Sequence, residues 1–237
     1  MVLLSLATPG LRAQAPATVP NAIEWWQGAA VLGGVAAASG FDHAIQLWAQ
    51  QSRSPTTDHV AAIVRHMGQP EVFATVPLGM IGAGLIANNS SLREAGERVT
   101  ASVAVAGVLV TGLKLVVGRV RPSQTSDPYQ FHPFTRSDGF PSGHATMAFA
   151  LATALGDEIG SPWWVRAGLF AGATATAWSR LNDNMHWLSD VLAGAALGVT
   201  SAQVMEGKWA AFHIHAPTFS AVRTRAGVGW VISLPLP

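Results

Sequence analysis

The segment from Lys114 to Pro122 places two cations at the end of an apolar run. Lys114 and Arg121 are seven residues apart, which is two helical turns, so both side chains project from one face of a helix. Pro122 is expected to end that helix because its ring excludes the preceding residue from the α region. A guanidinium offers a planar fork of donors and an ammonium a point charge, so the pair predicts an anion clamp. A solvated helix end with snorkelling cations is the alternative.

A second segment, Phe140-Pro141-Ser142-Gly143-His144, precedes a predicted helix over Ala145–Gly156. Ser142 is a good N-cap, Gly143 lets the backbone approach a ligand closely, and the free amides of a helix start favour phosphate. His144 then lies in the first turn, directed at whatever those amides hold. An ordinary cap with a partly buried histidine is the alternative for this segment alone.

The third segment holds Arg180 at the end of a predicted helix, followed by His186 and Asp190. His186 and Asp190 are four residues apart and therefore share one helical face. A carboxylate there can accept from one ring nitrogen and leave the other as a nucleophile or base. A surface pair worth a few tenths of a kcal/mol is the alternative.

The three segments are weak evidence singly and strong evidence together. Their cations, two histidines, one carboxylate and one Ser-Gly pair all fall at helix ends on a single side of an alternating bundle. Such a set can bind a phosphate group and break its ester, since charge stabilisation and a nucleophile are what that reaction needs. Asp138 does not fit an anion site, and we expect it to point away or to pair with Arg136.

The ordered set Lys-x6-Arg-Pro, Pro-Ser-Gly-His and Ser-Arg-x5-His-x3-Asp resembles the signature of the type 2 phosphatidic acid phosphatase/haloperoxidase superfamily over residues 99–204. The resemblance implies an all-α fold, a bundle of about six core helices. It also implies a set of groups that bind the substrate's phosphate oxygens: Lys114, Arg121, Ser142, Gly143 and Arg180.

The same resemblance implies the catalytic groups. His186 is the expected nucleophile, forming a phosphohistidine, and Asp190 orients it. His144 is the expected acid that protonates the leaving alkoxide and then the base that activates water. Phosphatase members need no metal, so no metal ligand is predicted, and vanadate is expected as an inhibitor that mimics phosphate.

We therefore expect a metal-independent phosphatase that acts on a small phosphomonoester or on a lipid phosphate or diphosphate. One alternative is a vanadium-dependent haloperoxidase on the same residues, with vanadate as its cofactor. The other is a non-enzymatic envelope protein that binds phosphate or lipid head groups. Two histidines with an orienting carboxylate argue against pure anion binding.

Composition excludes several other classes of protein. Charged residues make up 11% and hydrophobic residues 49% of the 237 residues, and the mean hydropathy is +0.31, so a disordered chain is ruled out. A net charge of +1 without a Lys/Arg cluster disfavours nucleic-acid binding. Zero cysteines exclude disulfides and a cysteine nucleophile. Nothing indicates an obligate protein partner.

Six stretches lack Asp, Glu, Lys and Arg, and they are rich in Ala and Gly: Trp25–Phe41, Val72–Ile86, Val99–Leu113, Ala145–Gly156, Ala167–Ser179 and Val191–Val204. They predict either six short, closely packed membrane helices or a buried bundle outside the bilayer. With Lys114, Arg121 and Arg180 set aside as site residues, the remaining cations divide seven to four between the two ends of the bundle. This division favours membrane contact with the site on the non-cytoplasmic face. A soluble periplasmic protein after signal cleavage is the alternative.

Three regions are expected along the chain. Residues 1–20 are signal-like or disordered, residues 21–210 form the helical phosphatase domain, and residues 211–237 form a C-terminal tail. The tail alternates and is β-prone, which predicts a short hairpin. One amphipathic helix is expected near Val60–Met67, and an irregular loop over Ser123–Phe140.

Overall fold

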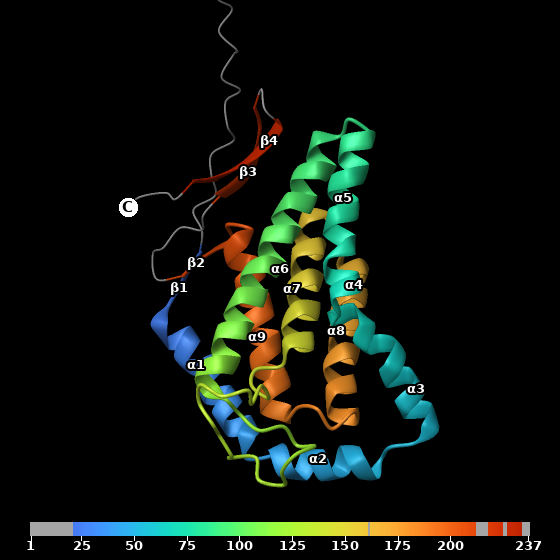
Figure 1. The fold of residues 1–237 in the computed structure, drawn as a ribbon, viewed down its shortest axis with the longest axis vertical. Helices are drawn as coiled ribbons and strands as arrows, with labels where there is room; N and C mark the ends of the chain where they lie inside the picture. The colour runs from blue at the N-terminus through green and yellow to red at the C-terminus, as the bar shows by residue number, and fades with distance from the viewer. Residues whose placement is uncertain (1–20, 161, 212–217, 225–226, 234–237) are drawn as a thin grey trace, which may run out of the picture.

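The computed structural model describes residues 21–160, 162–211, 218–224 and 227–233. The signal-like segment predicted over residues 1–20 lies outside these ranges. The described part is dominated by helices, which confirms the all-α class (Figure 1). The helices are α1 (Trp25–Ser39), α2 (Asp42–Gln51), α3 (Pro55–Val64), α4 (Pro70–Phe73), α5 (Thr75–Ile86), α6 (Ser90–Val117), α7 (Gly143–Glu158), α8 (Trp163–Asn182) and α9 (Leu188–Met205), with a 3₁₀ turn at Arg65–Gly68 between α3 and α4.

Four long helices, α6 to α9, stand side by side, and α5 packs against α6 (Figure 1). Helix α7 lies at the centre, and its residues from Ala150 to Gly156 are all buried. Because the chain runs up and down, the end of α6, the start of α7, the end of α8 and the start of α9 meet at the lower end of the bundle. This end carries all three sequence motifs.

Small residues let α9 approach α7 closely. A Cβ on Gly194 would lie 2.6 Å from the Ser142 carbonyl oxygen, and one on Gly198 would lie 2.3 Å from that of Thr146. No side chain fits at those distances, so glycine is required at both positions. The close approach brings the start of α9 against the start of α7, where the backbone N–H of Ser142 donates to the Asp190 carbonyl at 3.0 Å.

Beneath the lower end of the bundle, α2 crosses the ends of α8 and α9 (Figure 1). The Gln50 side-chain amide donates to the carbonyls of Leu181 and Asn182, and the Gln46 amide donates to Asn184. These bonds attach α2 to the connection between α8 and α9. Helix α2 thereby becomes part of the floor of the region where the motifs meet.

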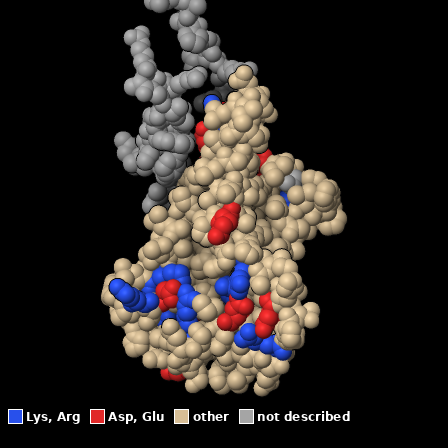
Figure 2. All heavy atoms as spheres, turned by 45° about the vertical axis from the view of Figure 1, so that its right-hand side comes forward, with Lys and Arg blue, Asp and Glu red and all other residues tan. Residues whose placement is uncertain are grey.

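Large apolar side chains cover the outside of the helices. Leu32 is 72% exposed, Val108 73% and Ile86 90%. Figure 2 shows a mostly uncharged surface on this face, with most of the visible charged side chains gathered towards the lower end. Among the described residues, α6 and α9 are the two helices long and apolar enough to cross a membrane, by length and composition.

Some elements differ from the sequence expectation. Helix α6 extends to Ser90, well before Val99, because its charged first turns are accommodated by ion pairs such as Arg98 with Glu158. The polar region Asp42–Glu71, where one amphipathic helix near Val60–Met67 is expected, contains α2, α3, the 3₁₀ turn and the start of α4 instead.

The described residues contain two strand pairs, and one of them lies in the tail. Strand β1 (Asn21–Ile23) pairs in parallel with β2 (Trp209–Ala211). Strands β3 (Thr218–Thr224) and β4 (Gly227–Ser233) form an antiparallel hairpin, as predicted for the tail.

Candidate active site

The first motif leaves its helix earlier than the sequence indicated. Gly118 adopts a left-handed conformation, with φ of 59°, and ends α6 there rather than at Pro122. The prediction that Lys114 and Arg121 share one helical face is therefore wrong. Arg121 lies in an extended segment that runs antiparallel to the following loop, where Val120 N–H donates to the Gln130 carbonyl at 3.0 Å.

Lys114 and Arg121 nevertheless meet, and their common partner is Asp138. The Lys114 ammonium donates to the backbone carbonyl of Asp138. The Arg121 guanidinium binds the Asp138 carboxylate through two bonds of 2.7 and 2.6 Å. The sequence expectation that Asp138 points away or pairs with Arg136 is therefore wrong.

The carboxylate of Asp138 remains ionised in this position. Partial burial raises the pKa of Asp138, but the hydrogen bonds and charge of Arg121, with Lys114 and His186, outweigh that effect and lower it. An anion thus already occupies the fork of one predicted phosphate ligand. A phosphate group that uses both nitrogens of this fork must displace Asp138.

The second motif forms the start of α7 as predicted. The Ser142 hydroxyl accepts the Ala145 N–H as an N-cap, and Ser142 is fully buried. A Cβ on Gly143 would lie 3.6 Å from Cε of Lys114, so the lysine stem lies beside this turn. The first amides of α7 and the Lys114 ammonium are thereby on the same side of the site.

His144 follows in the first turn, where the other site groups set its protonation. Burial, then the positive charges of Arg180, His186, Arg121 and Lys114, lower the pKa of His144 to about 4. The imidazole is therefore neutral at neutral pH in this structure. A bound dianion would counter those charges, raise the pKa and let His144 carry a proton.

His186 lies just before α9 and is only 4% exposed. Its Nδ1 lies 2.6 Å from the Gly139 carbonyl oxygen and 3.6 Å from a carboxylate oxygen of Asp190. Because a carbonyl only accepts, Nδ1 carries the proton and Nε2 keeps its lone pair. Burial lowers the pKa of His186, an effect that Asp190 opposes and that Lys114 and Arg121 reinforce, so the neutral imidazole is favoured.

Arg180 closes α8 at the same end and is 5% exposed. Its guanidinium donates to Asp183 and, at 3.2 Å, to the Ser179 hydroxyl. Arg65 shares Asp183, with a separation of 3.2 Å. The Asp183 carboxylate holds the Arg180 guanidinium in place. The positive charge of Arg180 contributes to the lowered pKa of His144.

Sequence reasoning missed two groups that contact predicted residues, since the Gly139 carbonyl contacts His186 and Arg119 contacts Asp190. It also missed Asp42 and Ser189, which contact Arg119. The Gly139 group is a backbone carbonyl, which every residue type carries, so the sequence gives no signal for it. Arg119 lies inside the first motif, between Lys114 and Arg121, and the sequence signal was an arginine directly after an apolar run. The structure shows that this arginine is buried.

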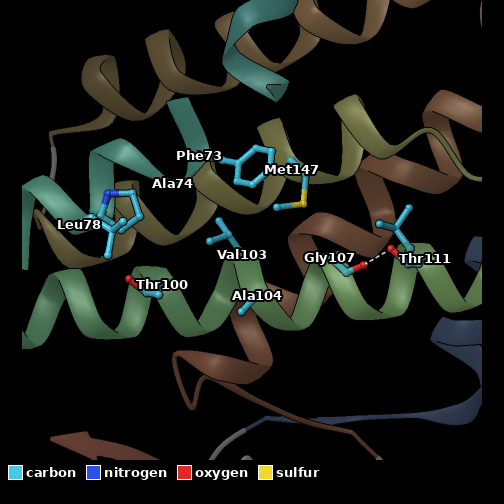
Figure 3. Close-up of a pocket in the computed structure, with 11 residues that line it drawn as sticks. Phe73, Ala74, Leu78, Thr100, Val103, Ala104, Gly107, Thr111 and Met147 are labelled. Carbon is cyan, nitrogen blue, oxygen red and sulfur yellow. Dashed lines mark hydrogen bonds between the residues drawn. The ribbon is translucent and has the colours of Figure 1, made fainter. Parts of the chain in front are cut away.

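An apolar groove of about 410 Å³ lies between α4, α5, α6 and α7 (Figure 3). Phe73, Leu78, Val103 and Met147 are among the residues that line it. Thr111 and Met147 also line the groove, and each is three residues from a predicted site residue, Lys114 and His144. One helical turn is about 5.4 Å, so these two lining residues lie within about one turn of Lys114 and His144 along their helices.

The family follows from comparison with known proteins. Residues 98–211, just under half of the chain, match the family model of the PAP2 superfamily, and all three motifs lie within this region. The match supports the resemblance indicated by the three motifs.

Individual relatives agree with this assignment. A lipid A 1-phosphatase of Porphyromonas gingivalis is 34% identical over 64% of this chain, which spans 30% of that protein. An undecaprenyl-diphosphatase of Sulfolobus acidocaldarius is 32% identical over 45% of this chain and 51% of its own length. The chain thus spans about half or less of the length of these curated relatives.

A solved structure shares the fold. The transmembrane PAP2-type phosphatidylglycerolphosphate phosphatase of Bacillus subtilis has a TM-score of 0.61 and 22% identity, covering 77% of this chain and 95% of that one. Within the described ranges, no group of three His, Asp or Glu side chains is arranged to hold a metal ion.

Proposed function

We propose that the chain is a metal-independent phosphatase of the cell envelope that removes a phosphate from a membrane lipid through a phosphohistidine. The observation that carries this proposal is the convergence at the lower end of the bundle. His144 lies within electrostatic range of His186 and of the cations Lys114, Arg121 and Arg180, although these residues come from separate elements.

The proposed reaction has two steps. Nε2 of His186 attacks the phosphorus while the P–O bond to the leaving alkoxide breaks, and His144 protonates that oxygen. A water molecule then attacks the phosphorus, His144 takes its proton, and the P–N bond breaks to release phosphate and neutral His186. The three cations and the first amides of α7 stabilise the charge on the phosphoryl oxygens.

The apolar groove supports a lipid as the substrate. Its apolar lining from α5, α6 and α7 suits acyl chains (Figure 3), and two of the lining residues, Thr111 and Met147, lie within about one helical turn of Lys114 and His144 along the chain. The exposed apolar exterior and the two candidate membrane helices support a position in the bilayer. The names of the relatives, which include a lipid A phosphatase and an undecaprenyl-diphosphatase, point to the same class of substrate.

The distribution of cations supports a site on the non-cytoplasmic face. Residues 21–210 make up the catalytic domain, and residues 1–20 and 211–237 are accessory segments. Phosphate binding is assigned to Lys114, Arg121, Ser142, Gly143 and Arg180.

The experiment that tests the function is phosphate release from short-chain lipid phosphates by the full chain in detergent or vesicles. We expect His186→Ala to abolish turnover, since losing a nucleophile costs up to ~10⁶ in rate. His59→Ala, on α3, removes a histidine outside the site and serves as the matched control. Near-native activity of His186→Ala, or a strict requirement for a divalent cation after EDTA treatment, would contradict the proposal.

A further inference from the structure

A buried network of charges lies behind Asp190. Arg119 binds Asp190 at 2.6 Å with Nη1 and Asp42 at 2.7 Å with Nη2. Asp42 and Asp190 are fully buried, and Arg119 is 2% exposed. Asp42 is the first residue of α2, so this network joins the floor of the bundle to the start of α9.

Ser189, which precedes Asp190 at the start of α9, binds Asp42 and Arg119. Its backbone N–H donates to Asp42 at 2.8 Å and its hydroxyl donates to Asp42 at 2.6 Å. The same hydroxyl accepts from Arg119 at 2.7 Å. The remaining oxygen of Asp190 accepts the Trp187 N–H at 2.7 Å. Every polar group in this cluster therefore has a partner, and the geometry of Asp190 is determined from several directions.

The charge count of this cluster matters for His186. Two carboxylates share one guanidinium, so the cluster keeps one net negative charge in a buried position. Arg119 does not form a two-bond pair with Asp190, because its Nε and Nη2 groups donate to the Pro128 carbonyl and to Asp42. The negative charge left on Asp190 faces a histidine that becomes positive when it attacks phosphorus.

We propose that Asp42 is a positioning residue for the reaction, acting through Arg119 to hold Asp190 in place and to preserve its negative charge behind His186. This inference rests on the proposed function. With Asp42 neutralised, Arg119 pairs with Asp190 alone, and the charged form of His186 loses part of its stabilisation.

Stability alone is a weak reason for such a cluster. Burying charges costs several kcal/mol per ion, and well-packed apolar residues often replace buried ion pairs without loss of stability. The cluster lies directly beneath the nucleophile, and one of its carboxylates is 3.6 Å from Nδ1 of His186. An electrostatic role towards His186 accounts for both facts.

The test compares Asp42→Asn with Asp58→Asn in the full chain. Asp58 lies in the first turn of the next helix, α3, and is paired with Arg53 at 3.0 Å, so the control removes the same charge from a solvent-exposed ion pair away from His186. We expect Asp42→Asn to lower kcat about tenfold with KM changed less than about threefold, and Asp58→Asn to leave both near wild type.

The deciding measurement is the pH profile of kcat/KM. Removing a negative charge disfavours protonation of His186, so the acid limb of Asp42→Asn moves to lower pH, by about half a unit or more. The other groups facing His186 are unchanged between the two proteins: Asp190, Lys114, Arg121, Asp138 and His144. An acid limb that stays where it is in wild type, with activity lost only in proportion to unfolded protein, would overturn the inference.

Ser189→Ala keeps the inference testable if Asp42→Asn does not fold. This variant keeps every charge but removes the hydroxyl that links Arg119 to Asp42. We expect kcat to fall at least about threefold at unchanged KM, with the acid limb unmoved. Unchanged kcat would count against positioning. Activity that survives in His186→Ala would instead refute the proposed function, so the two failures are distinguishable.

Discussion

Replacing Asp138 by asparagine separates the two uses of Arg121. The wild-type carboxylate holds the guanidinium fork through bonds of 2.7 and 2.6 Å, and phosphate must exchange with it. Asparagine keeps the size of the side chain and the backbone carbonyl that accepts from Lys114. It removes the negative charge that competes with the substrate. We therefore expect Asp138→Asn to bind vanadate and inorganic phosphate more tightly than the wild type.

The size of the effect follows from exposure. A charge-assisted hydrogen bond is worth about 1.5–3 kcal/mol when shielded, and an exposed ion pair about 0.2–1 kcal/mol. The side chain of Asp138 is 48% exposed and that of Arg121 is 19% exposed, so the contact belongs near the exposed limit, at about 1 kcal/mol. Since 1.4 kcal/mol is tenfold, the expected gain in affinity is about fivefold. Repulsion between Asp138 and the bound anion acts in the same direction.

The assay is the inhibition constant of vanadate against phosphate release at neutral pH. Asp127→Asn is the control, because it removes the same charge from the same loop, where its carboxylate accepts only the Tyr129 N–H among the described contacts. Changing pH is a poor substitute for mutation. The pKa of Asp138 is lowered, so its charge persists down through the mildly acidic range and is lost only below the usual aspartate value. An inhibition constant that is unchanged or raised in Asp138→Asn refutes the competition.

Two further results are expected. Gly118→Ala should destabilise the protein by at least about 2 kcal/mol more than Gly160→Ala, because both glycines have positive φ but only a Cβ at Gly118 meets another atom, the His132 carbonyl oxygen at 1.9 Å; equal melting temperatures would contradict this. Vanadate binding near pH 6 should take up more protons in the wild type than in His144→Gln, because the bound anion raises the pKa of His144 from about 4. Calorimetry in two buffers measures that uptake, and equal uptake in both proteins would show that His144 does not titrate on binding.

Much of the arrangement was predictable because it depends on local patterns. Apolar runs indicated the bundle, and a cap such as Ser142 marked the start of α7. The alternation of helices then requires that motifs at successive helix ends fall on one side. This logic needs no knowledge of side-chain contacts, which is why the grouping of the motifs at one end was reached from the sequence.

The other features depend on which of two competing local signals prevails, or on contacts between residues far apart in the sequence. Gly118 and Pro122 are both stop signals, and only packing decides that the glycine in its left-handed conformation ends α6. The contact between Asp42 and Ser189 joins residues 147 positions apart, so no periodicity reports it. Tertiary packing likewise decides that Asp138 pairs with Arg121 rather than with Arg136.

One dipeptide explains how cations gather at this end of the bundle. The Asp138 carbonyl accepts from Lys114, its carboxylate binds Arg121, and the Gly139 carbonyl accepts from His186. Like charges brought together in a partly buried site repel one another unless an acceptor lies between them. The dipeptide supplies that acceptor from the loop just before α7. Under the proposed function, phosphate replaces the Asp138 carboxylate as the anion partner of Arg121. The backbone carbonyls of Asp138 and Gly139 continue to accept from Lys114 and His186, so His186 keeps its tautomer.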